Sequence, residues 1–234
     1  MEGFGSIKDV ASYDVLAKYY DELLQDEESL SLWLKYIEET DFKTVLELAS
    51  GSGVMASILA SKGYDVIASD LSSSMKDVSR NNFDGEYHIL NMIEFDLGKT
   101  FDLVLCICDS INYLVEDELD SMFKSVYKHL NNGGRFIFDM HSLKRLDEFV
   151  EEYIEEGSLE DAFYQWSIVS DKIDNSLNER FVFFFDDELV QEHHTQHVFR
   201  PEVVIKKLED VGFKVRRIED FVEDEKELYI GEKL

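Results

Sequence analysis

Residues 45–56 limit the possible fold more than any other part of the chain. They read VLELASGSGVMA, an apolar run followed by small residues and then by a helical pattern. This order predicts a buried strand, a tight turn and the start of a helix. Gly51 and Gly53 lack a Cβ where a ligand must approach the backbone, and the free N–H groups of the following helix point toward that ligand.

A second apolar run, residues 64–69, ends at Asp70. A carboxylate at the tip of the neighbouring strand can accept hydrogen bonds from both hydroxyls of a ribose. The glycine turn and the acid Asp70 together predict a cofactor that contains a nucleoside. Residues 51–56 also fit the dinucleotide fingerprint G-x-G-x-x-G/A. However, Glu47 stands just before the turn, where it would repel a pyrophosphate and would suit a cofactor with a cationic end.

Residues 47–53, ELASGSG, resemble the first motif of the class I S-adenosylmethionine-dependent methyltransferases, with Ala49 where the first glycine is commonest. Residues 63–75, 101–114 and 133–142 resemble later strands and loops of that family, in the same order and spacing. Asn91 stands where the family commonly has an acid. The resemblance covers roughly residues 8–145 and implies S-adenosyl-L-methionine as the cofactor.

Near the start, residues 13–21 resemble a Tyr-Asp-x-x-Ala-x-x-Tyr-Asp segment of family members that act on small molecules. There the leading helix lies over the cofactor, although the pattern also fits an amphipathic helix that only packs on the domain. The expected cofactor-binding residues are Tyr13, Tyr20, Glu47, Ala49, Ser50, Gly51, Gly53, Asp70, Leu71, Met75, Asn91, Met92, Cys108, Asp109 and Ser110.

Apolar periodicity predicts alternating strands and helices up to a helix at about 142–154, and alternation of this kind is typical of a parallel sheet wrapped by helices. Aromatic, strand-like segments then follow, before a helix opened by Pro201 and two final strands. We therefore expect an α/β fold with a Rossmann-like, seven-stranded, mostly parallel sheet and helices on both faces. Residues 1–159 and 200–234 would form this domain, and residues 160–199 a small antiparallel β insertion after the fifth strand, over the acceptor site.

Few side chains are candidates for a general base. His141 follows the fifth strand, at the sheet edge where open α/β sheets bind ligands, although a histidine there could simply cap the strand. Glu192, His194 and Gln196 share one face of a strand by the period-two rule, and they line either the acceptor pocket or the outer face of a hairpin. No metal site is expected. The expected acceptor-pocket residues are Asn112, Tyr113, His141, Trp166, Glu192, His194 and Gln196.

Charge and composition narrow the choice of partners. The net charge of −28 disfavours nucleic acid and anionic membranes, because binding them relies on clusters of Lys and Arg. No run of eighteen apolar residues and no signal peptide is visible, which favours a cytoplasmic protein. Cys106 and Cys108 are expected to point to one face of a buried strand as free thiols, because they are poorly placed to bridge. A homodimer is left open.

The sequence thus predicts an S-adenosylmethionine-dependent methyltransferase that acts on a small-molecule acceptor. Two alternatives belong to other classes: a nicotinamide-dependent oxidoreductase, and a cofactor-binding module without turnover. Glu47 and the segment 109–114, DSINYL, count against the oxidoreductase.

Overall fold

The computed structural model describes residues 7–24, 27–38, 42–222 and 225–234. Its main sheet has seven strands in the order β11-β12-β6-β5-β2-β3-β4. β6, β5, β2, β3 and β4 run parallel, while β12 is antiparallel to β6 and to β11. The bounds are β2 Thr44–Glu47, β3 Asp65–Asp70, β4 Glu86–Ile89, β5 Phe101–Cys106, β6 Leu130–His141, β11 Phe213–Val222 and β12 Lys226–Lys233.

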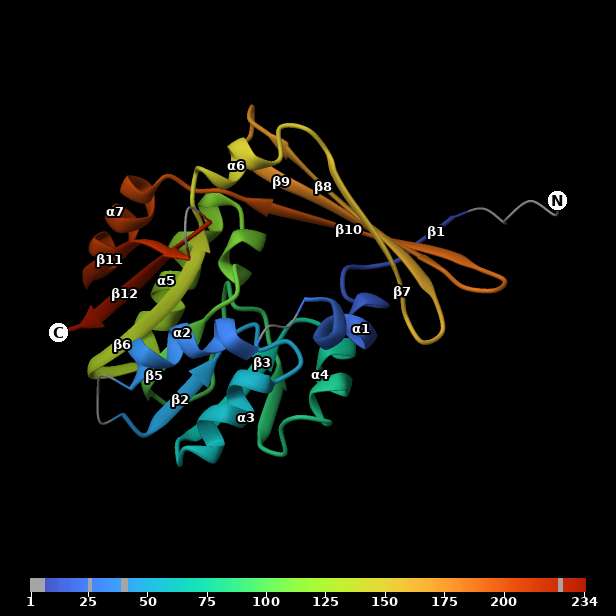
Figure 1. Cartoon of the computed structure of the whole chain (residues 1–234). Helices are drawn as coiled ribbons and strands as arrows, with labels where there is room; N and C mark the ends of the chain where they lie inside the picture. The colour runs from blue at the N-terminus through green and yellow to red at the C-terminus, as the bar shows by residue number, and fades with distance from the viewer. Residues whose placement is uncertain (1–6, 25–26, 39–41, 223–224) are drawn as a thin grey trace.

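Helices cover both faces of this sheet, as Figure 1 shows. On one face, buried residues of α5 and α7 pack on the sheet in one apolar cluster, and on the other face α2 and α3 do so in a second. The strands between them are apolar on both sides, as buried parallel strands must be. The bounds are α2 Glu27–Ile37, α3 Val54–Ser61, α4 Ser73–Ser79, α5 Glu116–Lys128 and α7 Pro201–Val211. The predicted fold class is therefore confirmed.

A second sheet of five strands, in the order β1-β10-β9-β8-β7, lies above the carboxyl edge of the main sheet (Figure 1). β7 to β10 pair antiparallel, and the short β1 pairs parallel to β10. Helix α1, Leu16–Leu23, lies beneath this sheet and packs its Leu16 and Tyr19 against it. The bounds are β1 Lys8–Asp9, β7 Tyr153–Ser158, β8 Phe163–Asp171, β9 Ser176–Phe184 and β10 Leu189–His197.

The helix predicted at about 142–154 is wrong for most of its length. Only a short helix, α6 (Arg145–Glu148), forms, and Tyr153–Ser158 is the edge strand β7. Leu146 and Phe149 pack on Ile168 and Leu177 in a small cluster, and β7 takes its hydrogen bonds from β8. Tertiary pairing thus overrides the local helical pattern, and the antiparallel sheet takes in β1 and β7 besides residues 160–199.

The two cysteines do not share a face, contrary to expectation. β5 ends at Cys106, and the chain then turns, so that Cys108 has a φ of 59°. Cys106 packs in the cluster with α5, whereas Cys108 packs against the cluster on the other face of the sheet. Both are free thiols. In the part of the chain that the structure describes, no helix has the length and apolar character needed to cross a bilayer.

Candidate active site

Two cavities meet at the carboxyl edge of the main sheet. The larger, of about 610 Å³, lies at the ends of β3 and β4. The smaller, of about 320 Å³, lies between the ends of β2, β5 and β6 and the antiparallel sheet, which we call the roof (β1 and β7–β10). Seven residues line both cavities and mark the junction: Tyr13, Tyr20, Ala49, Gly51, Cys108, Ser110 and Tyr113.

The residues predicted for the site divide among these spaces. Those lining only the larger cavity are Asp70, Leu71, Met75, Asn91 and Met92. Those lining only the smaller cavity are Glu47, Ser50, Asp109, His141, Trp166, His194 and Gln196. Gly53, Asn112 and Glu192 line neither cavity, and each has a different structural task.

The turn after β2 depends on left-handed backbone at Ala49, Gly51 and Gly53, with φ values of 50°, 53° and 79°. The two glycines serve different ends. A Cβ on Gly51 would stand 3.9 Å from the ring of Tyr20, at the junction of the cavities. A Cβ on Gly53 would come within 3.2 Å of Phe83 and 3.3 Å of Ser79. Gly53 therefore lets the turn pack on neighbouring side chains and does not face a ligand.

Asp70 ends β3 and holds the turn in place. Its carboxylate accepts hydrogen bonds from the backbone N–H of Gly51 at 3.0 Å and of Ser72 at 2.9 Å. Burial raises the pKa of Asp70, and these N–H donors oppose that rise. Further along the larger cavity, Asn91 accepts from the N–H of Ile93 through its amide oxygen at 3.0 Å. This hydrogen bond fixes the orientation of the Asn91 amide at the wall of the larger cavity.

Glu47 ends β2 and is buried at 2% exposure. Its carboxyl group accepts a hydrogen bond from the hydroxyl of Ser50 at 2.9 Å. Burial raises the pKa of Glu47 to about 8, because desolvation disfavours the charged form. A cation placed in the smaller cavity would reverse this effect, so Glu47 is suited to bind a positively charged group.

The N-terminal segment brings two tyrosines over the junction. The hydroxyls of Tyr13 and Tyr113 lie 2.6 Å apart, and the rings of Tyr13 and Tyr20 meet edge to face at 6.1 Å between centroids. Glu192 fixes this segment, because its carboxylate accepts from the N–H groups of Tyr13, Val15 and Leu16. Glu192 therefore caps the start of α1, and its predicted place in the acceptor pocket is wrong.

An ion-pair network that sequence reasoning missed lies under the junction. Lys226 contacts Asp109 at 2.8 Å and Asp139 at 3.7 Å. Asp139 also accepts from the N–H groups of Cys108 and Asp109 at 2.7 and 3.1 Å, which fixes the turn after β5. Burial raises the pKa of Asp139 to about 7 against the opposing charge of Lys226. Burial also tends to raise the pKa of Asp109. The charges of His141 and Lys226 outweigh the effect of burial and hold the pKa of Asp109 below its usual range.

His141 is 5% exposed at the end of β6. Its Nε2 lies 2.9 Å from the amide oxygen of Gln196, which can only accept, so Nε2 carries the proton. Its Nδ1 lies 3.6 Å from Asp109 Oδ1. Asn112 accepts from the backbone N–H of His141 at 3.0 Å and donates to the carbonyl of His197 at 2.6 Å. Asn112 therefore braces β6 against β10 and is not a pocket residue, contrary to expectation.

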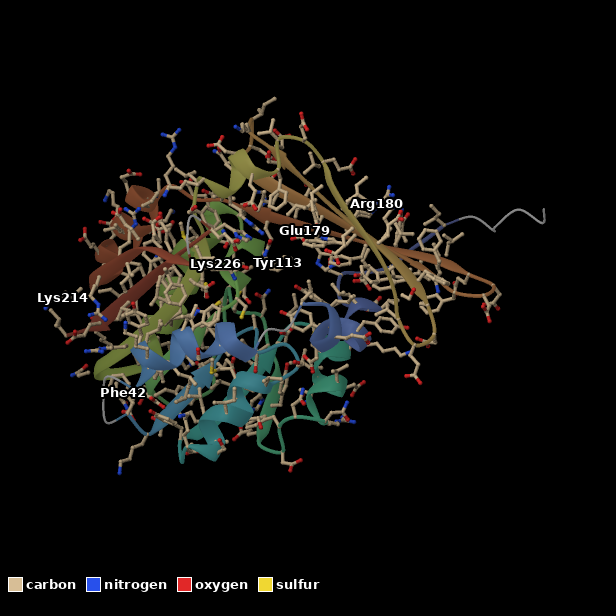
Figure 2. The ribbon with its side chains drawn as sticks, viewed as in Figure 1. Phe42, Tyr113, Glu179, Arg180, Lys214 and Lys226 are labelled. Carbon is tan, nitrogen blue, oxygen red and sulfur yellow. The ribbon has the colours of Figure 1, made fainter. Side chains whose placement is uncertain are left out.

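The roof presents one face to the smaller cavity. Glu179 of β9 stands directly opposite Ile168 of β8 and His194 of β10. His194 lies 3.1 Å from the hydroxyl of Tyr113 through Nδ1 and 3.4 Å from Glu192 through Nε2. Figure 2 shows Glu179 on the side of the roof toward Tyr113 and Lys226, with Arg180 beyond it.

The sequence analysis also did not predict Glu179 as a site residue. Its place two residues before Phe181, on the same face of one strand, could have indicated it. Lys226 and Asp139 gave no such signal, because their partners lie on distant strands. Within the described ranges, no group of three or more His, Cys, Asp or Glu side chains is arranged to hold a metal ion.

Comparison with known proteins agrees with this architecture. Residues 45–134 match a family model described as a methyltransferase domain. A protein of Geobacillus sp. (strain WCH70), provisionally named a methyltransferase, is 28% identical over 232 residues, with 91% of this chain and 94% of that protein covered.

Two solved structures share the fold. An S-adenosylmethionine-dependent methyltransferase from Clostridium acetobutylicum ATCC 824 has a TM-score of 0.79 at 24% identity, covering 94% of this chain and 98% of that one. The sugar N-methyltransferase KedS8 from Streptoalloteichus sp ATCC 53650 has a TM-score of 0.82 at 20% identity, covering 100% of this chain and 98% of that one. Together with the glycine turn, the acid that ends β3 and the sheet order, these matches support a resemblance of the chain to the class I S-adenosylmethionine-dependent methyltransferases.

Proposed function

We propose that this protein transfers a methyl group from S-adenosyl-L-methionine to a small-molecule acceptor held under the roof. One observation carries the proposal: a larger cavity at the ends of β3 and β4 opens into a smaller one under the roof. The reaction needs two ligands whose reactive ends meet, and the junction at Gly51, Tyr13 and Tyr113 is where they would do so.

The residues present fit the cofactor. Gly51 leaves room at the junction for a ligand to lie against the backbone. Asp70 lines the larger cavity at a strand end, where a ribose is bound in this architecture. Glu47, buried in the smaller cavity, matches the cationic methionine end. Leu71, Met75 and Met92 supply apolar wall for the adenine.

When bound, the cofactor supplies an electrophilic methyl group on a sulfonium sulfur. The protein contributes position, because the acceptor atom must be held about 3–3.5 Å from that carbon and in line with the departing sulfur. We assign His141 as the group that takes a proton from the acceptor. Gln196 orients the ring through its Nε2–H, and the carboxylate of Asp109, 3.6 Å from Nδ1, stabilises the protonated ring.

A small acceptor suits the enclosure and the charge of the site. Both β1 and β7 belong to the roof, so the acceptor cover extends beyond residues 160–199. The net charge of −28 disfavours a nucleic-acid acceptor. The fold neighbour from Streptoalloteichus, named a sugar N-methyltransferase, is consistent with a metabolite as substrate. We place the reaction in the cytoplasm, where two free cysteines persist.

Binding calorimetry tests the cofactor assignment. We expect S-adenosylmethionine and S-adenosylhomocysteine to bind and NAD not to bind. Binding of NAD alone would establish the oxidoreductase instead. Turnover is then tested by incubating the protein with labelled S-adenosylmethionine and a metabolite extract. Cofactor binding without transfer to any component would favour a module without turnover.

A further inference from the structure

We propose that Glu179 and the aromatic rings beside it form a subsite that selects an acceptor carrying a protonated amine. This inference rests on the proposed function and names its substrate class. Glu179 stands at the centre of the roof face that borders the smaller cavity, with Ile168 on one side and His194 on the other. Figure 2 shows that it faces Tyr113, which lines the junction with the larger cavity.

Glu179 differs from the other acids that line this cavity. Asp109 is paired with Lys226 at 2.8 Å, and Glu225 lies 3.5 Å from Arg145. Glu47 lies at the cofactor end, beside the glycine turn. Among the residues that the structure describes, Glu179 has no ion pair with Lys or Arg. Its charge is therefore available to a ligand.

One oxygen of Glu179 is fixed and the other is free for a ligand. Oε2 accepts a hydrogen bond from the indole N–H of Trp166 at 2.9 Å, which orients the carboxylate. No donor contacts Oε1 within the described ranges. Burial raises the pKa of Glu179, with the charge of His194 opposing the rise. An arriving cation would favour the ionised form, because a nearby opposite charge stabilises a buried carboxylate.

Aromatic rings flank the carboxylate. Trp166 stacks on Phe181 with ring centroids 5.8 Å apart and planes 9° apart, and both line the cavity together with Tyr113. Aromatic faces attract cations, and more strongly in a desolvated site. An acid without a cationic partner, set among such rings, binds an ammonium group better than a hydroxyl of the same size.

The test uses a matched pair of probes, 2-phenylethylamine and 2-phenylethanol, titrated by calorimetry into the full chain saturated with S-adenosylhomocysteine. We expect the amine to bind at least tenfold more tightly than the alcohol. In Glu179→Gln, amine binding should weaken at least tenfold, because the amide can still accept from Trp166 but has no charge. The affinity for S-adenosylhomocysteine should stay within twofold.

Two further variants sharpen the result. Glu156→Gln removes the same charge from the exposed edge of the roof and should leave amine binding unchanged. Glu179→Asp keeps the charge and should bind the amine more tightly than Glu179→Gln does. Equal binding of amine and alcohol, no binding of the amine, or full amine affinity in Glu179→Gln would overturn the inference. If S-adenosylhomocysteine itself does not bind, the proposed function fails, which is a different outcome.

Discussion

At the scale of single residues, the glycine turn shows how one motif carries two separate requirements. Gly51 and Gly53 both have positive φ, so a side chain at either position brings backbone strain. Only Gly51 borders the cavities, whereas Gly53 is pressed against Ser79 and Phe83. The same substitution should therefore affect binding at one position and folding at the other.

We expect Gly51→Ala to lose most of its affinity for S-adenosylhomocysteine, while its circular dichroism spectrum stays that of the unmodified protein. Gly53→Ala should lower the free energy of unfolding by about 1–3 kcal/mol more than Gly51→Ala does, because overpacking adds to the strain. Calorimetry and urea denaturation measure the two effects. Unchanged binding in Gly51→Ala would mean that the ligand does not lie against this turn.

Asp70→Ala should weaken S-adenosylhomocysteine binding by about 2–4 kcal/mol, because two charge-assisted hydrogen bonds to the ribose are lost. The backbone N–H groups of Gly51 and Ser72 also lose their acceptor. The variant Asp70→Asn removes the charge but keeps part of the support of the turn, because its amide oxygen can still accept from one of these two N–H groups. An unchanged dissociation constant in Asp70→Ala would remove Asp70 from the site.

The raised pKa of Glu47, about 8, predicts two pH dependences of opposite sign. The folded state binds the proton more tightly than the unfolded state does, so the free energy of unfolding falls as pH rises from about 4.5 to about 8. A cationic ligand stabilises the ionised form, so affinity for S-adenosylmethionine should rise from pH 6 to pH 7.5. In Glu47→Gln, both the free energy of unfolding and the affinity for S-adenosylmethionine should depend less on pH. A pH dependence that persists in this variant would have to come from another titrating group.

At the scale of elements, α1 depends on a distant strand for its start. Its N-terminal residue lacks a side-chain cap of its own, and Glu192 of β10 supplies the acceptor from the roof. Burial raises the pKa of Glu192, but the hydrogen bonds from His194 and from backbone N–H groups outweigh it and lower the pKa overall. This stabilisation is therefore present at neutral pH and is lost on acidification below the ordinary glutamate range.

Glu192→Ala should lower the free energy of unfolding by about 2–4 kcal/mol, because buried N–H donors are left without an acceptor. It should also weaken cofactor binding, since Tyr13 and Tyr20 lose their support. Urea denaturation at pH 7 measures the first effect and calorimetry the second. Thr195→Ala, on the exposed face of the same strand, is the control and should change neither by more than about 0.5 kcal/mol. A similar loss in both variants would contradict the capping role.

At the scale of the whole molecule, the main sheet and the roof each contribute to a different cavity. The turns of the main sheet form the larger cavity, and the roof closes the smaller one. Gln196 connects the two, because its amide oxygen holds Nε2 of His141. A substitution at Gln196 should therefore impair acceptor binding and proton transfer, and it should leave binding of the ribose of the cofactor unchanged.

In Gln196→Ala we expect the affinity for S-adenosylmethionine to stay within about twofold. Methyl transfer should fall at least tenfold, which corresponds to about 1.4 kcal/mol of lost transition-state stabilisation. His194→Ala should reduce transfer similarly, because it releases Tyr113 at the junction. The measurements are calorimetry and initial rates with the identified acceptor. A loss of cofactor affinity equal to the loss of rate would show that roof and cofactor site are not separable.

The sequence by itself determined the class of fold and the position of the glycine turn at which we propose that the cofactor binds. Both depend on local order: apolar runs alternating with helical patterns, and a glycine turn between a strand and a helix. Glu47, Gly51 and Asp70 could be predicted as cavity residues because each stands at a fixed offset from the end of a strand.

Only the tertiary structure decided which polar residues face the cavities. Glu192 and Asn112 matched the expected pattern, yet their hydrogen bonds go to α1, β6 and the backbone of His197. Glu179 and Lys226 reach the site because β9 and β12 arrive there through pairings that no local pattern encodes. The strand β7 likewise forms through its pairing with β8, which the local sequence pattern did not indicate. Whether a polar side chain supports the fold or meets a ligand depends on the partners that distant strands bring, because a buried polar group must be satisfied by whatever lies beside it.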